Sequence, residues 1–464
     1  LTISVSGKKP LVVSYIGMKK KEVSIAGKSV IDIVLEDANT TLNEVVAIGY
    51  GTVRKKDLTG SVGTIKGSTL ASIPVPNIGE ALAGKLSGVR VTTTDGSPDA
   101  EVVIRVHGGG SITGSNTPLY IVDGFTVNSI NDISPNDIED MTVLKDASST
   151  AIYGSRGANG VILITTKKAE GGKTRINYNG FVQTKKIAKR LDAMNAYDYV
   201  RSNYEYALIK GSDEVKSFEK NFGVYDDLDL YKYIGATDWQ DDMFGANVLS
   251  QQQNISITGG TEKTNFMLSG TYDYNGGLMV NNDFSRYAFE FKLNHQIAKN
   301  LKFGLNVRVN DQTVNGSGTQ GGTYKIRTSQ AITSAATKGL SAFTTIDTSN
   351  MSDDEYEQYI ENNMSLSEQA QRYWKKQNTR GYNFNASLDW TIIKGLVAHT
   401  EVGYGYGYRE LKNWWGANTT QASYVGGLPL ADWKKTNTRS MREEFNLTYN
   451  FKVNKDHNFN VMIG

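Results

Sequence analysis

The chain has 464 residues, of which 39% are hydrophobic, and a formal net charge of +2. Its mean hydropathy is −0.39, and no uninterrupted apolar run is long enough for a transmembrane helix, so a helical membrane protein is not indicated. The near-neutral charge gives no indication of nucleic-acid binding. Cysteine is absent, which excludes disulfides and thiolate metal sites and favours an oxidising compartment.

The first 36 residues contain four short strand-like runs separated by Gly-Lys turns: Leu1–Val5, Leu11–Tyr15, Glu22–Ile25 and Val30–Leu35. Four short strands bury too little surface for a core of their own, so we expect the end of a β-sandwich. No signal peptide is visible at Leu1, and because the chain opens inside a strand pattern we expect a cut or processed N-terminus.

Residues 37–56 form a linker around the apolar run Leu42–Ile48. The run is suited to a free strand that pairs with the sheet edge of a partner. An ordinary buried strand is the alternative, and the residues alone favour it by about two to one.

Residues 57–172 have mixed character, which predicts a compact α+β domain. Helical spacing is present in Ile78–Leu86, Pro135–Met141 and Ala147–Tyr153. Strand patterns are present in Val89–Thr93, Glu101–Val106, Leu119–Asp123, Met141–Leu144 and Val161–Thr166.

From residue 173 onward, apolar and polar residues alternate over runs of about ten residues or more, as in Leu301–Val309. Such alternation suits strands whose two faces meet different media, and this length crosses a bilayer as a tilted strand. The pattern predicts about nine strands, at 174–185, 249–260, 263–275, 284–297, 300–311, 379–393, 396–410, 438–453 and 457–464. Short turns follow the even strands and longer loops the odd ones, which is typical of an outer-membrane barrel.

Several motifs suggest chemistry, but each has a plainer interpretation. His107–Gly110 is similar to an oxyanion-hole motif, yet no G-x-S-x-G nucleophile elbow accompanies it, so a glycine turn is favoured. Gly154–Gly160 precedes a strand, whereas a dinucleotide fingerprint opens a helix. We expect His295 and His399 to point into the barrel lumen as solvated residues. The acidic clusters Asp226–Asp227 and Asp353–Glu355 could hold calcium, but they lack EF-hand spacing and favour solvated loops, so no metal or cofactor is expected.

Four segments carry a specific family resemblance. They are LNEVVAIGYGTVRKKDLTGSV (42–62), EALAGKLSGVRVTTTDGSP (80–98), SNTPLYIVDG (115–124) and IEDMTVLKDASSTAIYGSRGANGVILITTKK (138–168). Together they resemble the SusC-like (SusC/RagA) TonB-linked outer-membrane proteins, in that family's order. Residues 1–36 are similar to the end of the family's N-terminal extension, a carboxypeptidase-regulatory-like β-sandwich.

The resemblance implies a plug domain (57–172) inside a 22-stranded barrel, of which residues 173–464 would be the first part. It also implies a SusD-like surface lipoprotein that captures substrate, and energy delivered by TonB, which pairs with a TonB box by strand addition. The box corresponds here to Glu44, Val45, Val46, Ala47 and Ile48. With the resemblance, this edge-pairing interpretation outweighs the buried strand.

Two residues depart from the family's pattern. Ala47 stands where valine is usual, which strand pairing should tolerate because its hydrogen bonds are made by the main chain. His107 stands where the family usually has arginine, in a strand written here as Val103–Gly108. Histidine has neither the permanent charge nor the bidentate fork of arginine, so a salt bridge made there in relatives need not form here.

The resulting expectation is a non-enzymatic importer in the outer membrane, with its plug and N-terminal region facing the periplasm and an oligosaccharide or peptide as substrate. The chain is expected to be an N-terminal fragment, since nine strands cannot close so wide a barrel. Five polar residues are expected at plug–barrel or lumen contacts: Arg105, Asp123, Asp146, Arg156 and Asn159. Trp239, Trp374, Trp414 and Trp415 are expected to be loop aromatics. The alternatives are a passive porin-like channel, a hydrolase built around His107, and a non-transporting adhesin or sensor.

Overall fold

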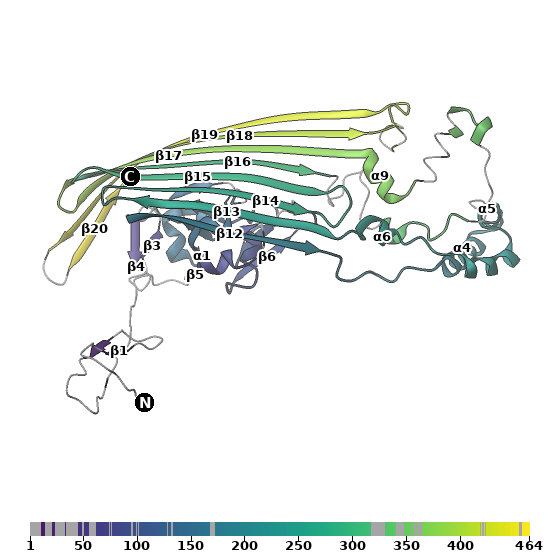
Figure 1. Ribbon diagram of the computed structural model, residues 1–464, viewed down its shortest axis with the longest axis horizontal. Helices are drawn as coiled ribbons and strands as arrows, with labels where there is room; N and C mark the ends of the chain where they lie inside the picture. Colours follow the sequence, from purple (N-terminus) through teal and green to yellow (C-terminus); the bar gives the residue numbers. More distant parts are fainter. Residues whose placement is uncertain are drawn as a thin grey trace.

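The computed structural model describes residues 62–167, 172–316, 330–339, 348–453 and 457–464, apart from a few positions within these ranges. It also describes residues 11–13, 21–23, 33, 45–48 and 51–54. Its two large parts are a curved nine-stranded sheet and an α+β domain that lies against one face of that sheet (Figure 1). We call this the inner face, and the opposite one the outer face.

The nine strands of the large sheet follow one another in chain order, and every neighbouring pair is antiparallel. The nine predicted strands are therefore confirmed. They are β12 (Gly172–Lys185), β13 (Val248–Gly260), β14 (Thr264–Gly276), β15 (Asp283–Ala298), β16 (Leu301–Asn315), β17 (Tyr373–Ile393), β18 (Leu396–Trp415), β19 (Leu430–Lys452) and β20 (Asn458–Ile463).

Strands β17, β18 and β19 are longer than predicted at one end. Main-chain pairing continues to Trp415, which lies opposite both Tyr373 and Leu430. These extensions lack the apolar alternation on which the prediction depended, because polar residues occupy both faces there. The expectation that Trp374, Trp414 and Trp415 lie in loops is therefore wrong, since all three are on strands.

Connections differ in length between the two ends of the sheet. One end has the short connections 261–263, 299–300 and 394–395, and the other has the long segments 186–247 and 316–372. The first long segment contains α4 (Ala196–Lys210), α5 (Ser212–Phe222), η4 (Tyr225–Tyr233) and α6 (Trp239–Phe244). The second contains α7 (Gln330–Thr333), η6 (Thr348–Asn350) and α9 (Leu366–Arg372).

Helices α4, α5 and η4 stand beyond the strand ends (Figure 1) and pack around their own small core, which includes Val200, Phe218 and Tyr231. α6 packs instead against α7 and α9 of the second long segment. Trp239 begins α6, and its indole donates a hydrogen bond to the Ala335 carbonyl at 2.8 Å. Within the described part of the chain, the helices are too short or too polar to cross a membrane.

The α+β domain is built on a five-stranded sheet of order β5-β10-β11-β8-β9. Its strands are β5 (Val62–Lys66), β8 (Leu119–Val122), β9 (Phe125–Val127), β10 (Ile138–Leu144) and β11 (Val161–Thr166), and a separate hairpin joins β6 (Val89–Thr93) to β7 (Val102–Val106). The helical pieces are α1 (Gly67–Ala71), α2 (Ile78–Ala81), η2 (Pro135–Asp137), α3 (Ala147–Thr150) and η3 (Ala151–Gly157). Fully buried residues such as Leu70, Ile78, Met141 and Ile162 form its core.

Two predicted helices are shorter than expected. The helix predicted over Ile78–Leu86 ends at Ala81 and is followed by turns. The helix predicted over Pro135–Met141 is wrong after Asp137, because Ile138 already begins β10. β10 is paired on both sides, and its buried residues Ile138 and Met141 are three positions apart with the less buried Glu139 and Asp140 between them, a spacing that also fits a helix.

Only short pieces of the N-terminal region are described. β1 (Leu11–Val13) pairs with β2 (Lys21–Val23), whereas Leu1–Val5 and all of Val30–Leu35 except Ile33 lie outside the described residues. β3 (Val45–Ile48) pairs with β4 (Gly51–Arg54), and Figure 1 shows this hairpin at the short-connection end of the large sheet. Glu44 lies outside the described residues.

Candidate functional site

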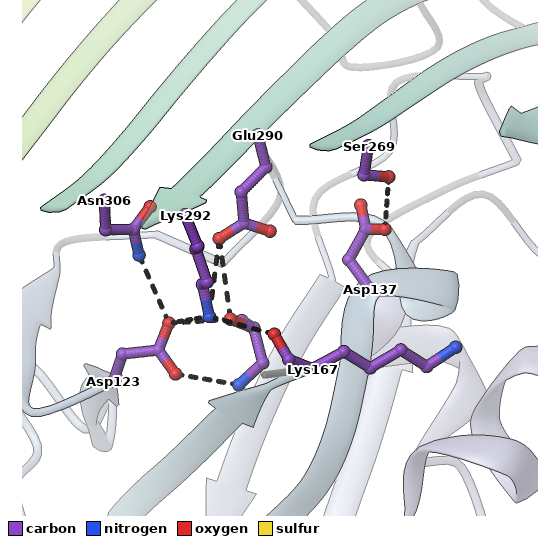
Figure 2. Close-up of polar contacts among 8 residues, drawn as sticks. Asp123, Asp137, Lys167, Ser269, Glu290, Lys292 and Asn306 are labelled. Carbon is purple, nitrogen blue, oxygen red and sulfur yellow. Dashed lines mark hydrogen bonds and ion pairs between the residues drawn. The ribbon is translucent and has the colours of Figure 1, made fainter. Parts of the chain in front are cut away.

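The site lies where the α+β domain meets polar residues of the inner face (Figure 2). Two carboxylates of the domain, Asp123 and Asp137, make the contact from separate elements. Asp123 is in the turn between β8 and β9, and Asp137 ends the 3₁₀ turn η2. Asp123 therefore projects from a turn with a strand on each side, and Asp137 from a turn that leads directly into β10.

The Asp123 turn is specified by its own sequence. Val122 and Phe125 are directly paired, so the connection has two residues. Asp123 and Gly124 have φ angles of 51° and 93°, as a type I′ turn requires, and Asp-Gly is a preferred dipeptide for that turn. The local sequence thus holds the carboxylate at the tip of a hairpin.

The Asp123 carboxylate accepts hydrogen bonds from three other residues (Figure 2). Lys292 of β15 donates at 2.8 Å, and Asn306 of β16 donates at 3.3 Å. Within the domain, Thr166 donates from its backbone amide at 2.8 Å and from its hydroxyl at 2.7 Å. One carboxylate therefore joins β8, β11 and two strands of the large sheet.

The Asp123–Lys292 ion pair is largely removed from solvent. The Lys292 and Asp123 side chains are 9% and 18% exposed, and the Glu290 carboxylate lies 3.7 Å from the Lys292 ammonium. Burial by itself raises the pKa of Asp123, but the Lys292 charge and the Thr166 hydrogen bonds outweigh it and hold the pKa below its ordinary value. Asp123 thus stays ionised in spite of its burial, because Lys292 and Thr166 compensate the loss of solvent.

Asp137 forms the second contact, about one strand away. It accepts hydrogen bonds from Ser269 of β14 at 2.5 Å and from Asn254 of β13 at 3.4 Å. The neighbouring Asn136 donates to Gln252 at 2.9 Å and accepts from Asn179 at 2.6 Å. Burial is the largest influence on Asp137 and raises its pKa, despite the hydrogen bonds from Ser269 and Asn254.

A polar cavity of about 520 Å³ adjoins the first contact, near the short-connection end of the sheet. Its lining includes Asp123, Lys292 and Asn306, together with Asp389 and Glu401. The ion pair therefore borders a cavity with several charged and polar side chains in its lining.

The two strand histidines lie on opposite faces. His399 contacts Asp389 at 2.6 Å and Glu401 at 3.4 Å on the inner face. His295, opposite Phe303, shares the side of Phe291 and Leu293 by strand alternation, so its expected lumen position is wrong; its ring contacts Thr264 at 2.7 Å.

The described ranges contain no group of three or more His, Asp or Glu side chains placed to hold a metal ion. Two members of the acidic clusters instead accept hydrogen bonds from backbone amides. Asp227 accepts from Val224, and Glu355 from Ser352, which lowers the pKa of Glu355.

Comparison with known proteins gives these contacts a context. The profile of the family described as TonB-dependent Receptor Plug Domain matches residues 54–161, which include most of the α+β domain. TonB-dependent receptor P3 of Formosa agariphila is 30% identical over 459 residues, covering 97% of this chain and 42% of the relative. TonB-dependent receptor SusC of Bacteroides thetaiotaomicron is 37% identical over 309 residues, covering 64% of this chain and 29% of the relative.

Among solved structures, the RagAB peptide importer in its "open-open" state matches with a TM-score of 0.72 and 27% identity. The match covers 90% of this chain and 48% of that one. The chain belongs to the SusC-like TonB-dependent receptors. It spans less than half the length of the relatives given above. The α+β domain is the plug of this receptor, and the nine-stranded sheet is part of its barrel wall.

The five polar residues predicted at plug contacts occupy different environments. Asp123 contacts Lys292 and Asn306 of the barrel wall. Asp146 caps α3 by accepting from the Ser149 amide, and Asn159 donates to the Ser115 carbonyl at 2.8 Å within the plug. Arg105 is half-buried on β7 opposite Arg90, and Arg156 is exposed in η3.

Sequence reasoning missed most of the residues that face Asp123 and Asp137. Alternation in Leu301–Val309 predicts that Asn306 faces the plug or the lumen, and it does contact Asp123. Lys292, Ser269 and Asn254 are ordinary polar positions in alternating strands, and nothing in the pattern separates them from their neighbours. The position of Asp137 could be predicted in part, because the pair Ser134-Pro135, two residues before it, predicts a tight helical start. That signal locates a turn, but it does not indicate a partner across the interface.

Proposed function

We propose that this receptor imports a nutrient across the outer membrane, with TonB supplying the energy. The observation that carries the proposal is the buried, charge-paired attachment of the plug to the wall. A plug held by an ion pair and a few hydrogen bonds can be released by work done elsewhere on the chain and can dock again. Similarity to the SusC and RagAB proteins supports the same function.

The proposal divides the chain as expected from its sequence. Residues 1–36 are the end of a carboxypeptidase-regulatory-like extension, 37–56 a linker with the TonB box, 57–172 the plug, and 173–464 the first part of the barrel. The box comprises Glu44–Ile48. Support comes from the main chain of β3, which pairs with β4 along one edge and leaves its other edge without a strand partner among the described residues.

The proposed substrate is an oligosaccharide or a peptide, delivered by a SusD-like lipoprotein on the cell surface. The peptide class is supported by likeness to a structure described as a peptide importer. The plug and N-terminal region would face the periplasm, where TonB can reach β3. No covalent chemistry is assigned to any residue, and the exposed His107 is part of a glycine turn after β7.

Uptake by cells that produce the full-length receptor tests this proposal. Labelled oligosaccharides and peptides should accumulate in wild-type cells, and a protonophore that removes the energy source should stop accumulation. Uptake that continues under the protonophore would indicate a passive porin-like channel. Surface binding without accumulation would indicate a non-transporting receptor.

A further inference from the structure

The outer face of the barrel wall carries an apolar groove of about 530 Å³, a volume within the range of ligand sites. It lies across β13, β14, β15 and β16, on the side opposite the plug. Its floor is Gly270, where an added Cβ atom would meet only the Ile255 side chain, at 3.9 Å. The groove therefore exists because one position in an otherwise filled row has no side chain.

The strand register defines the walls of the groove. One row of directly paired residues crosses four consecutive strands: Ile255, Gly270, Phe289 and Val309. Ile255 and Phe289 are 51% and 44% exposed. Among the described residues, none covers these two apolar side chains, so they are open to the surroundings of the wall.

The next row toward the long-connection end is different in character. In the same four strands it consists of Gln253, Tyr272, Tyr287 and Asp311. Asp311 forms an ion pair with Arg380 at 2.8 Å. The rings of Tyr272 and Tyr287 are 4.9 Å apart. Mixed aromatic and polar rows of this kind mark a membrane–water boundary. One end of the groove is therefore polar, and the other is apolar.

The width of the groove limits what can occupy it. Ile255 and Phe289 are separated by two inter-strand spacings, about 10 Å between backbones, and their own side chains take up part of that distance. A helix about 10–12 Å across does not fit. Another strand cannot pair there, because the main chain of β14 already pairs with both neighbours. A single hydrocarbon chain fits.

We propose that the groove binds one acyl chain of a membrane lipid from the leaflet nearer the long connections. The lipid's polar headgroup would lie at the row of Gln253 and Asp311, and its chain would run over Gly270. This inference goes beyond import and rests only on the outer-membrane placement that is part of the proposed function. The groove would hold a structural lipid against the wall, and it would not bind the imported substrate.

Native mass spectrometry of the full-length receptor in mild detergent, with added lipid A as the acylated lipid of the extracellular leaflet, tests the proposal. Gly270→Leu fills the groove and should lose one bound lipid relative to wild type. Ala386→Leu places the same side chain on the outer face of β17, opposite Leu305, and should retain the wild-type number. Tyr287→Ala opens the groove instead of filling it and should release lipid at lower collision energy than wild type.

Equal lipid retention by wild type, Gly270→Leu and Tyr287→Ala would overturn the proposal. So would equal lipid loss by Ala386→Leu, retention of added palmitate but not of lipid A, or a concentration-dependent dimer that Gly270→Leu abolishes. Uptake is measured on the same variants. If wild type and every variant fail to import while the lipid difference between them persists, only the proposed transport function is refuted.

Discussion

Replacing Lys292 by methionine should weaken the docking of the plug on the barrel wall, and the burial of the ion pair gives the magnitude of the change in free energy. The Lys292 side chain is 9% exposed, and its ammonium is the only cation that contacts Asp123 among the described ion pairs. Removing one partner of a buried pair costs about 3–5 kcal/mol. Because Asp123 keeps its neutral donors Thr166 and Asn306, the lower end applies, about 3 kcal/mol or about 100-fold in the docking equilibrium.

Hydrogen exchange in the full-length receptor measures this change. The Thr166 amide donates directly to Asp123, so the β11 segment should exchange about 100-fold faster in Lys292→Met if opening is at equilibrium. The double variant Asp123→Asn/Lys292→Met removes both charges and should recover part of the protection.

The matched control is Arg380→Met. Arg380 also pairs with an aspartate, Asp311, but the two side chains are 50% and 43% exposed on the outer face, where such pairs contribute about 0–1 kcal/mol. Exchange in Lys292→Met within about 3-fold of wild type would refute the reasoning, since it would put the pair near the value of an exposed one. A double variant less protected than the single one would refute it too.

Three further predictions concern the plug and its linker. Asp123 has a lowered pKa and Asp137 a raised one, so the docking contribution of Asp123 is lost as pH falls below about 4, whereas that of Asp137 is lost as pH rises through its raised value. In wild type, the melting temperature of the plug should therefore decrease as pH rises through the raised pKa of Asp137. In Asp137→Asn this decrease should be absent. Gly67→Ala should destabilise the plug by about 1–3 kcal/mol, because the new Cβ would lie 1.8 Å from the Ile138 carbonyl oxygen; denaturant titration measures it. Val46→Pro should abolish uptake with normal surface expression, because proline cannot donate a ladder hydrogen bond.

Each of these has an outcome that contradicts it. An unchanged pH profile in Asp137→Asn would show that this carboxyl does not titrate with docking. The control for Gly67→Ala is Gly96→Ala, whose Cβ would meet nothing within 4 Å; equal effects of the two would remove the steric explanation. Normal uptake by Val46→Pro would refute the TonB-box assignment.

The sequence predicted the wall well and its attachment to the plug only partly, for physical reasons. Alternation reports the contrast between lipid and lumen, so it located all nine strands but not the extension of β19 from 438 back to Leu430, where both faces are polar. Asp123 could be found because its Asp-Gly turn follows a clear strand. Lys292 could not, since its role comes from the register that brings β15 over that turn.

The order of strands in the plug sheet also determines where a pull on the linker is first resisted. β5 is the first plug strand after the linker, and it is an edge strand, paired only with β10 through the five residue pairs from Val62–Leu144 to Lys66–Asp140. Asp123 and Thr166 belong to β8, β11 and their turns, further along the chain. Tension applied at residues 45–48 therefore loads a single hydrogen-bonded ladder before it reaches the ion pair, so the plug can lose its edge while the Lys292 contact still fastens its centre to the wall.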